Sequence, residues 1–191
     1  MATTKVDVNL ISATGTPGSG NFLRGDGTWN TPAAGFTQGT EQATTSGTSF
    51  TFGSIPAGVD MVVLTFENVG FTSDLGIDVQ IGDSGGIETS GYIQGCVSIQ
   101  GTTTTAVRAE TDRFEMTDAQ GSASMGWHGS VFLTLKDSSN FTWIANWCVY
   151  TDTATERIGW GAGSKSLSAE LTQLQLSGGT FDQGSANIMY M

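Results

Sequence analysis

The sequence predicts an all-β protein: an antiparallel β-sandwich, jelly-roll-like, with an extended N-terminal arm and a Gly/Thr/Pro-rich linker. The 191 residues include 27 glycines and only 13% charged residues, which is typical of short strands joined by tight turns. Apolar and polar residues alternate in short segments, and no segment has a convincing helical pattern. The length suits one domain of about 150 residues plus a short extension.

Residues 1–35 are expected to form the arm and the linker. In the arm, Val6, Val8 and Leu10 alternate with polar neighbours, a pattern that makes an edge strand only where a partner supplies the other side. The linker, residues 15–35, is too polar to build a core. We therefore expect this region to gain order by packing against another chain.

One bulky cluster interrupts the linker. Phe22 and Leu23 precede the stretch Arg24-Gly25-Asp26-Gly27, and Trp29 follows it. An Asp-Gly pair favours positive φ, so these four residues are predicted to form a tight turn. The Arg-Gly-Asp triplet is interpreted as part of that turn and not as an adhesion ligand.

Residues 36–191 are predicted to form the sandwich. Strands are expected at residues 49–53, 61–69, 76–81, 92–100, 107–116, 130–135, 141–150, 167–176 and 186–190. Short strands at such spacing favour an antiparallel sandwich over a βαβ fold. In the strand at 141–150, five residues share one face that is expected to pack in the core: Phe141, Trp143, Ala145, Trp147 and Val149. Neither a tandem repeat nor a heptad pattern is present, so no β-helix shaft or coiled-coil stalk is expected.

Charge and hydropathy exclude several classes of partner. Eighteen acidic and seven basic side chains give a net charge of −11, which opposes binding to nucleic acid or to an anionic membrane surface. No apolar run approaches the ~20 residues that span a bilayer, and the N-terminus lacks the apolar region of a signal peptide. No membrane insertion is expected.

The acidic residues offer two patterns that could carry chemistry. Asp74, Asp78, Asp83 and Glu88 form the densest acidic patch, but their spacing does not match a calcium loop, and solvated strand ends are the favoured interpretation. Metal binding there is the alternative.

The second pattern is a carboxylate cluster at residues 110–118, where paired carboxylates could serve glycoside hydrolysis. Alternation places Glu110 and Asp112 on one face and Glu115 on the other, with Arg108 and Arg113 available for ion pairs. A solvated strand with local ion pairs is the favoured interpretation. His128 is the only histidine, and no nucleophile motif accompanies it. We therefore expect no catalytic residue, metal or cofactor.

Two tryptophans lie between glycines, Trp127 in GWHG and Trp160 in GWGAG. Glycine-flanked rings are expected to be exposed in loops, where flat aromatic faces can stack on sugars or anchor a protein partner. Trp127, His128 and Trp160 are therefore the candidate receptor contacts, and residues 121–129 and 151–164 the candidate exposed tip. Alternatively, the two rings close the ends of the sandwich or lie in a seam between chains.

Four strings resemble one known family. FLRGDGTW closely resembles a motif of bacteriophage tail fibre and other virion fibre proteins, where it usually precedes a C-terminal β domain. Three further strings, FTFGSIPAGVDMVVLTFENV, QIGDSGGIETSGY and TFDQGSANIMYM, resemble successive pieces of one such domain in the same order. Together the linker and these three strings cover roughly a third of the chain.

The resemblance implies a structural virion protein assembled in the host cytoplasm: a short tail fibre, homotrimeric, that acts in viral attachment to the host cell. The arm and linker would anchor it to another virion protein, in the tail or the capsid, and the sandwich would bind a host surface glycan or receptor. The anchoring residues would be Val6, Val8, Leu10, Phe22, Leu23 and Trp29. In the reducing bacterial cytosol, Cys96 and Cys148 are expected to be buried small hydrophobes and not a disulfide.

Two other functions remain open at this point. A capsid-decorating head fibre or cement protein would use the same arm and sandwich. A capsule-degrading depolymerase is less favoured, because such an enzyme usually has a longer chain with an elongated β-helix.

Overall fold

The chain divides into two units, Met1–Gly35 and Phe36–Met191. This boundary coincides with the one drawn from composition. The computed structural model describes residues 13–16, 18–32, 35–73, 75–100, 103–104, 109–117, 125–151 and 157–191. The arm residues Val6, Val8 and Leu10 therefore lie outside the described residues.

The first unit contains a short hairpin of β1 (Phe22–Leu23) and β2 (Trp29–Asn30). The backbone N–H of Arg24 donates to the carbonyl of Thr28 at 2.8 Å, and Gly27 has a φ of +80°. The carboxylate of Asp26 accepts the Thr28 backbone N–H at 3.0 Å and its hydroxyl at 2.6 Å, which lowers the pKa of Asp26. The predicted turn is confirmed, and the Asp26 side chain is used within it.

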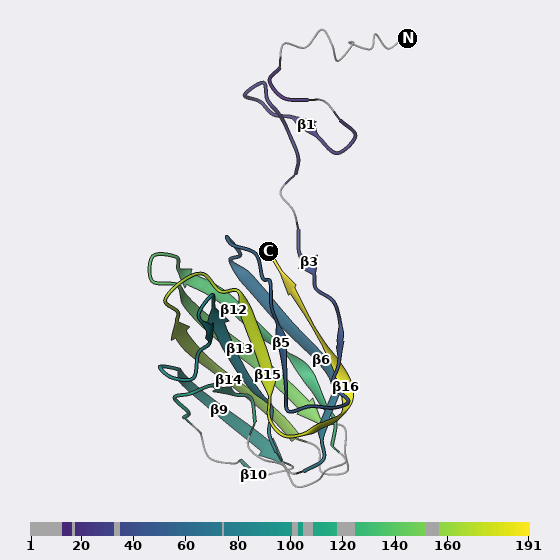
Figure 1. Ribbon diagram of the computed structural model, residues 1–191, viewed down its shortest axis with the longest axis vertical. Helices are drawn as coiled ribbons and strands as arrows, with labels where there is room; N and C mark the ends of the chain where they lie inside the picture. The colour runs from purple at the N-terminus through teal and green to yellow at the C-terminus, as the bar shows by residue number, and fades with distance from the viewer. Residues whose placement is uncertain are drawn as a thin grey trace. The chain divides into compact units, whose positions relative to one another are not determined.

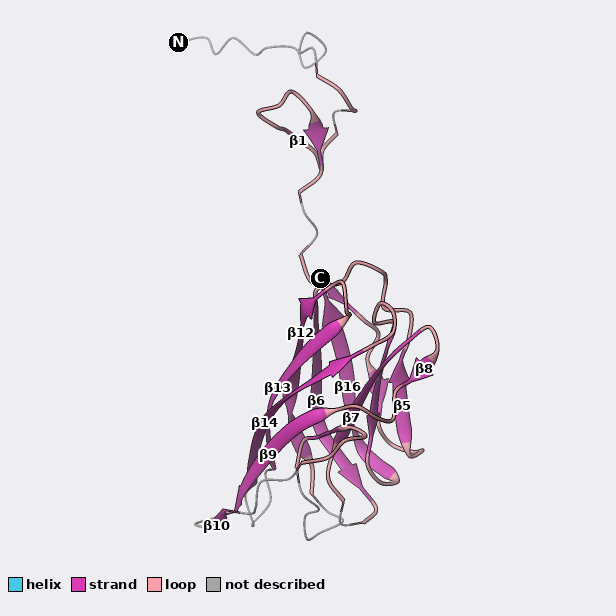
Figure 2. Ribbon diagram, turned by 90° about the vertical axis from the view of Figure 1, so that its left-hand side faces the viewer, coloured by secondary structure: helices cyan, strands magenta, loops and turns pink. Residues whose placement is uncertain are grey.

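The second unit is an antiparallel β-sandwich, as predicted, with two stacked sheets that Figure 2 shows edge-on. The larger sheet has the order β10-β9-β14-β13-β12-β6-β16-β3, and β4 also pairs with β16. Its strands are β3 (Thr37–Gln38), β4 (Gln42–Ala43), β6 (Met61–Phe71), β9 (Ile93–Gln100), β10 (Thr103–Thr104), β12 (Trp127–Asp137), β13 (Thr142–Thr151), β14 (Arg157–Ser166) and β16 (Phe181–Tyr190).

The smaller sheet has the order β11-β7-β15-β5, and β8 pairs with β7. Its strands are β5 (Ser49–Phe52), β7 (Asp78–Asp83), β8 (Gly86–Ile87), β11 (Phe114–Glu115) and β15 (Gln173–Ser177). The chain crosses between the sheets from β5 to β6 to β7, and again from β14 to β15 to β16. At these points the chain alternates between the two sheets, which ties them into one sandwich.

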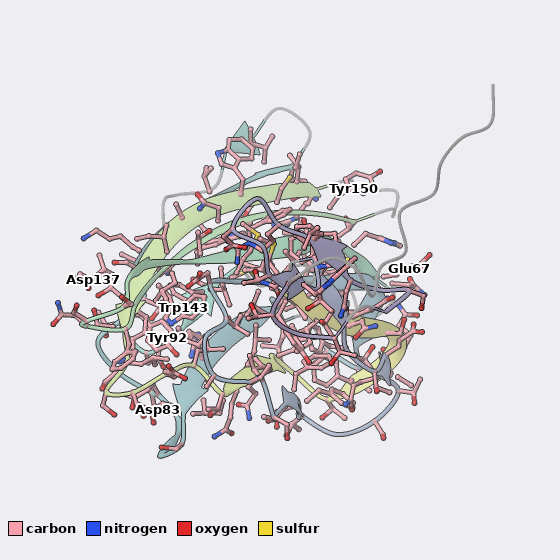
Figure 3. The ribbon with its side chains drawn as sticks, turned by 90° about the horizontal axis from the view of Figure 1, so that it is seen from above. Glu67, Asp83, Tyr92, Asp137, Trp143 and Tyr150 are labelled. Atoms are coloured by element: carbon pink, nitrogen blue, oxygen red, sulfur yellow. The ribbon has the colours of Figure 1, made fainter. Side chains whose placement is uncertain are left out.

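The core lies between the sheets and follows the period of two. On β6, Val62, Leu64 and Phe66 face inward and are buried, and the intervening Val63 is buried as well. On β13 the alternation is complete, and Trp143, Ala145, Trp147 and Val149 are all buried, as predicted. Figure 3 shows Trp143 and Tyr92 lying between the two layers.

Two predicted strands are shorter in the structure. Only Phe114–Glu115 of the strand predicted at 107–116 is β11; residues 109–113 are not strand, and 105–108 lie outside the described residues. The strand predicted at 167–176 begins only at Gln173. Residues 167–172 form loop contacts, such as the Leu167 N–H donating to the Phe141 carbonyl at 3.1 Å. Local apolar alternation does not distinguish a strand from a loop that covers a core edge.

In the segment 151–164, predicted as an exposed tip loop, residues 157–164 instead belong to the strand β14, hydrogen-bonded between β13 and β9. Residues 152–156, and residues 121–124 of the other predicted tip segment, lie outside the described residues. The glycines of β14 explain the difference. A Cβ on Gly161 would clash with the ring of Trp147, and one on Gly163 would come within 2.8 Å of the Phe114 ring. The glycines therefore occupy inner positions that two core rings cover, and alternation turns Trp160 to the outside.

The sandwich has two distinct ends. At one end, which we call the C-terminal end, Thr37 of β3 pairs with Tyr190 of β16. At the opposite end, the far end, Trp127 pairs with Thr151, and Thr151 with Arg157. In Figure 1 the C-terminus and β10 mark these two ends.

Candidate functional site: the outer face of the larger sheet

The outer side of β9, β14, β13 and β12 is unusually apolar for a surface, and we call it the apolar face. Away from the ends of the strands, its outward-pointing residues are Ile93, Gly95, Val97, Ile99, Ile158, Trp160, Ala162, Ser164, Ile144, Asn146, Cys148, Tyr150, His128, Ser130, Phe132 and Thr134. None of these is Asp, Glu, Lys or Arg, and the exposed Lys136 lies at the bulge that ends β12, at the border of the face. Five large apolar side chains on it are substantially exposed: Ile93 (74%), Phe132 (46%), Trp160 (42%), Tyr150 (40%) and Ile158 (39%).

The strand register sets the neighbours of Trp160. Cys148 of β13 and Val97 of β9 lie directly opposite it on the adjoining strands. One row closer to the C-terminal end, small residues follow: Ala162 is opposite Gly95 and Asn146. A shallow depression of about 410 Å³ lies there, which we call the hollow. Its lining includes Ile93, Gly95, Ile144, Ala162 and Ser164.

The three predicted receptor contacts differ in exposure. Trp127 was expected in an exposed loop, and this is wrong: it lies in β12 and is 1% exposed. Its place in the alternation of β12, with buried Val131 and Leu133, turns it inward. Trp160 is exposed as expected, but from a strand and not from a loop.

His128 lies beside Trp127 on β12 and is half-buried. The backbone N–H of Asn68 donates to its Nδ1 at 3.4 Å. This contact joins β12 to β6, so His128 has a structural role near the far end. Of the three candidates, Trp160 has the geometry of a contact residue.

The predicted anchoring residues of the linker are accessible within their own unit. Phe22 and Leu23 are exposed, and Trp29 is half-buried with its backbone N–H donating to the Thr14 carbonyl at 2.9 Å. The hairpin thus presents apolar side chains that no core of its own covers.

The acidic patch predicted around Asp78, Asp83 and Glu88 is divided among separate partners. Asp83 accepts the Ser168 hydroxyl at 2.6 Å and the Gly85 N–H at 2.8 Å, which lower the pKa of Asp83 and fix the β14–β15 loop. Glu88 pairs with Lys165 at 3.2 Å. Asp74 lies outside the described residues. Across the part of the chain that the structure describes, no three His, Cys, Asp or Glu side chains gather as metal ligands.

The carboxylate cluster is organised by one arginine. Arg113 pairs with Asp112 at 3.1 Å and with Asp78 at 3.3 Å. Glu115 of β11 lies directly opposite Asp78 of β7. Burial raises the pKa of Asp78 to about 7, while Arg113 lowers it and Glu115 raises it further. Arg108 and Asp118 lie outside the described residues.

The two cysteines point to opposite sides of the larger sheet and form no disulfide. Cys96 is buried in the core, as expected. Cys148 is exposed on the apolar face, which contradicts the expectation that both are buried.

A separate cavity of about 110 Å³ lies at the C-terminal end, lined by Val59, Asp60, Phe141, Trp143 and Glu170 among others. Its lining includes none of the predicted contact residues, so the apolar face, which carries Trp160, remains the candidate site.

Comparison with protein-family models, with curated proteins and with solved structures yields no match to this chain. Nor does any described segment form a helix with the length and apolarity to cross a bilayer. The chain's own sequence and geometry therefore carry the functional argument.

Proposed function

We propose that this protein is a structural bacteriophage virion protein, a short tail fibre that attaches the particle to the host cell as a homotrimer. The observation that carries the proposal is the FLRGDGTW string, which resembles the phage fibre motif and folds as a separate hairpin ahead of a β-sandwich. A hairpin with exposed Phe22 and Leu23 suits anchoring to another virion protein.

The positions of the two ends of the sandwich support this role. The second unit begins beside its own C-terminus, where Thr37 pairs with Tyr190. Trp127, Thr151 and Arg157, which border the predicted contact segments, lie at the far end. A receptor-binding end opposite the anchored end is the arrangement that an attachment fibre needs.

The mechanism we propose is multivalent adhesion without catalysis. Several weak contacts on each fibre and several fibres on each particle raise avidity by about 10²-fold or more over a single contact. Asp112, one of the carboxylates that could have served glycoside hydrolysis, is paired with Arg113, which supports a binding role over an enzymatic one.

Imaging of intact particles tests the proposal. Gold-labelled antibody against residues 36–191 should mark the tail in electron micrographs. Particles that carry no label at any position would contradict a virion role, provided that the antibody binds the purified protein.

A capsid-decorating head fibre or cement protein is the second candidate. Exposed Phe22 and Leu23 on a small separate hairpin would equally suit a clamp on capsomers. In this case the antibody would label the head, removal of residues 1–35 would abolish capsid binding, and particles lacking the protein would still adsorb.

A further inference from the structure

We propose that copies of this chain associate through the apolar face, with Trp160 and Phe132 of one copy packing into the hollow of another. The inference deepens the proposed homotrimer and rests on it. It assigns the contact between copies to a defined surface, which neither the strand pattern nor the family resemblance provides.

The exposure of the apolar face is the first argument. Large contiguous apolar patches are rare on monomeric soluble proteins, where the largest is typically about 300–600 Å² and often functional. Four strands at ~4.8 Å spacing and four outward rows at ~6.8 Å span a plane of roughly 500 Å². Three copies that each turn this plane toward a shared axis would bury roughly 1,500 Å² in all, divided among three contacts.

Charge is the second argument, because it leaves the apolar face as a surface where copies can meet without repulsion. Each chain carries a net charge of −11, so two copies repel wherever their acidic surfaces meet. The apolar face has no Asp, Glu, Lys or Arg among its outward-pointing residues. Exposed carboxylates lie elsewhere on the domain, such as Glu41, Glu67 and Asp182. Copies of this chain can therefore meet at the apolar face without placing carboxylates together.

Shape is the third argument. Trp160 lies one row from Ala162 on β14, and Phe132 lies in the row of Ala162 on the far side of Asn146, so both rings flank the hollow, whose lining includes the small residues Gly95 and Ala162. The same surface thus offers both a projection and a depression, so that the projection of one copy can enter the depression of the next, the head-to-tail contact from which a closed ring is built. Aromatic anchors in a depression are also the usual energetic centre of protein interfaces.

The surroundings of Trp160 favour a protein over a sugar as its partner. Sugar recognition combines an aromatic face with several placed hydrogen-bonding groups. The residues opposite Trp160 on the adjoining strands are Val97 and Cys148, and the next row holds Gly95 and Ala162. These neighbours offer apolar contact and few polar groups.

The test uses the full chain and a native thiol as the reporter. The face variant carries Ile93→Glu and Phe132→Glu, which introduce two charges into the apolar face but leave both strand neighbours of Cys148, Trp160 and Ser130, unchanged. The matched control carries Ser49→Glu and Thr51→Glu, two exposed positions on the edge strand of the smaller sheet. Each variant changes the charge by the same amount.

Two measurements are made on each protein, after circular dichroism has established that it is folded. Sedimentation at about 100 µM chain gives the mass, which detects association with a Kd in the micromolar range. The rate at which Cys148 reacts with the thiol reagent DTNB then reports whether the apolar face is covered. Cys96 is buried and serves as the thiol that reacts only on unfolding.

We expect the wild type and the control to be oligomeric, with Cys148 reacting at least about tenfold more slowly than in the face variant, because a covered thiol reacts only from the dissociated fraction. If the face variant does not fold, Phe132→Ser in its place should give the same faster labelling. A monomeric wild type would overturn the inference, and a glycan or another virion protein would then be the occupant of the face.

A wild-type oligomer whose Cys148 reacts as fast as in the face variant would also overturn the inference, because the contact between copies would then lie elsewhere. The fibre proposal would still stand in that case. Conversely, particles without antibody label would overturn the fibre proposal and leave the contact between copies intact.

Discussion

The outer faces of the two sheets cover the same core but have opposite chemistry. On the smaller sheet, polar side chains face outward and bond across strands: Gln175 donates to the Thr51 hydroxyl at 2.9 Å, and Gln80 donates to the Asp112 carbonyl at 2.9 Å. On the larger sheet the corresponding positions include Trp160 and Phe132. The outer face of the smaller sheet, which we call the polar face, suits contact with solvent, and the apolar face is the surface that the proposed contact between copies would cover.

The largest effect is expected for a core substitution, because burial in the core, and not either outer face, should stabilise the domain. Leu133 and Thr134 are neighbours on β12, one buried and one exposed. Leu133→Ala should lower the free energy of unfolding by about 2–5 kcal/mol, through lost burial and a residual cavity. Thr134→Ala should change it by no more than about 0.5 kcal/mol. Urea unfolding of both variants checks this, and equal losses would break the distinction between the two sides of the sheet.

The glycines of β14 provide the next test, because they explain why Trp160 points outward. Gly161→Ala places a methyl group against the Trp147 ring and should cost about 1–3 kcal/mol of stability by overpacking. The blue-shifted fluorescence expected of buried Trp147 should shift to the red. Ala162→Ser, on the outer side of the same strand, is the control. A fully stable Gly161→Ala protein would show that the ring does not rest on this strand.

On the polar face, titration of Asp78 should make the stability of the domain depend on pH. Burial raises the pKa of Asp78 from 3.8 to about 7, although Arg113 opposes this and Glu115, Asp112 and Glu110 add to it. Between these two pH values the folded chain holds a proton that the unfolded chain has released. The contribution of Asp78 to stability is therefore fully present below pH 4 and is lost as the pH rises through 7.

The variant Asp78→Asn resembles the protonated side chain, and Arg113 retains its pair with Asp112. It should remove the loss of stability between pH 4 and 7, on the order of 1–2 kcal/mol after allowance for the partial exposure of the carboxyl. Thermal unfolding across this range measures it, with exposed Asp182→Asn as the control. A parallel pH dependence in wild type and Asp78→Asn would contradict the assignment.

The smallest effect is expected at the cross-strand pair of the polar face. Gln175→Ala removes the hydrogen bond to Thr51 at an exposed position and should cost about 0.5 kcal/mol. It should leave the sedimentation mass unchanged, because the polar face contacts solvent. A change of mass in this variant would place a contact between copies on the smaller sheet and reverse the comparison.

Much of the fold could be predicted from local patterns. The boundary at residues 35 and 36 follows a change in composition, and the turn at Arg24–Gly27 follows from Asp-Gly chemistry. The inward face of β13 follows from strict alternation of large apolar residues. In each case, neighbours in the sequence carry the whole signal.

The site was only partly predictable, because glycine is typical both of exposed loops and of strand positions that a buried ring covers. Glycines on both sides of Trp160 suggest a loop when considered alone, yet they lie in β14 because Trp147 and Phe114, distant in the sequence, cover them. A period of two in Gly159, Gly161 and Gly163 was the signal that could have revealed the strand. Trp127 was misplaced for a related reason, since its burial depends on pairing with Val69 and Thr151.

The sequence by itself determined the β class, the two units, the hairpin turn and the strong negative charge, because each depends on composition or on residues close in the chain. Only the tertiary structure decided which rings are covered, how Asp78 comes to face Glu115, and which sheet face is apolar. These properties depend on which strands pair and in which register. The apolar face exists because the consecutive strands β12, β13 and β14 pair with the more distant β9, which places Ile93, Phe132, Tyr150 and Trp160 on one side of one sheet.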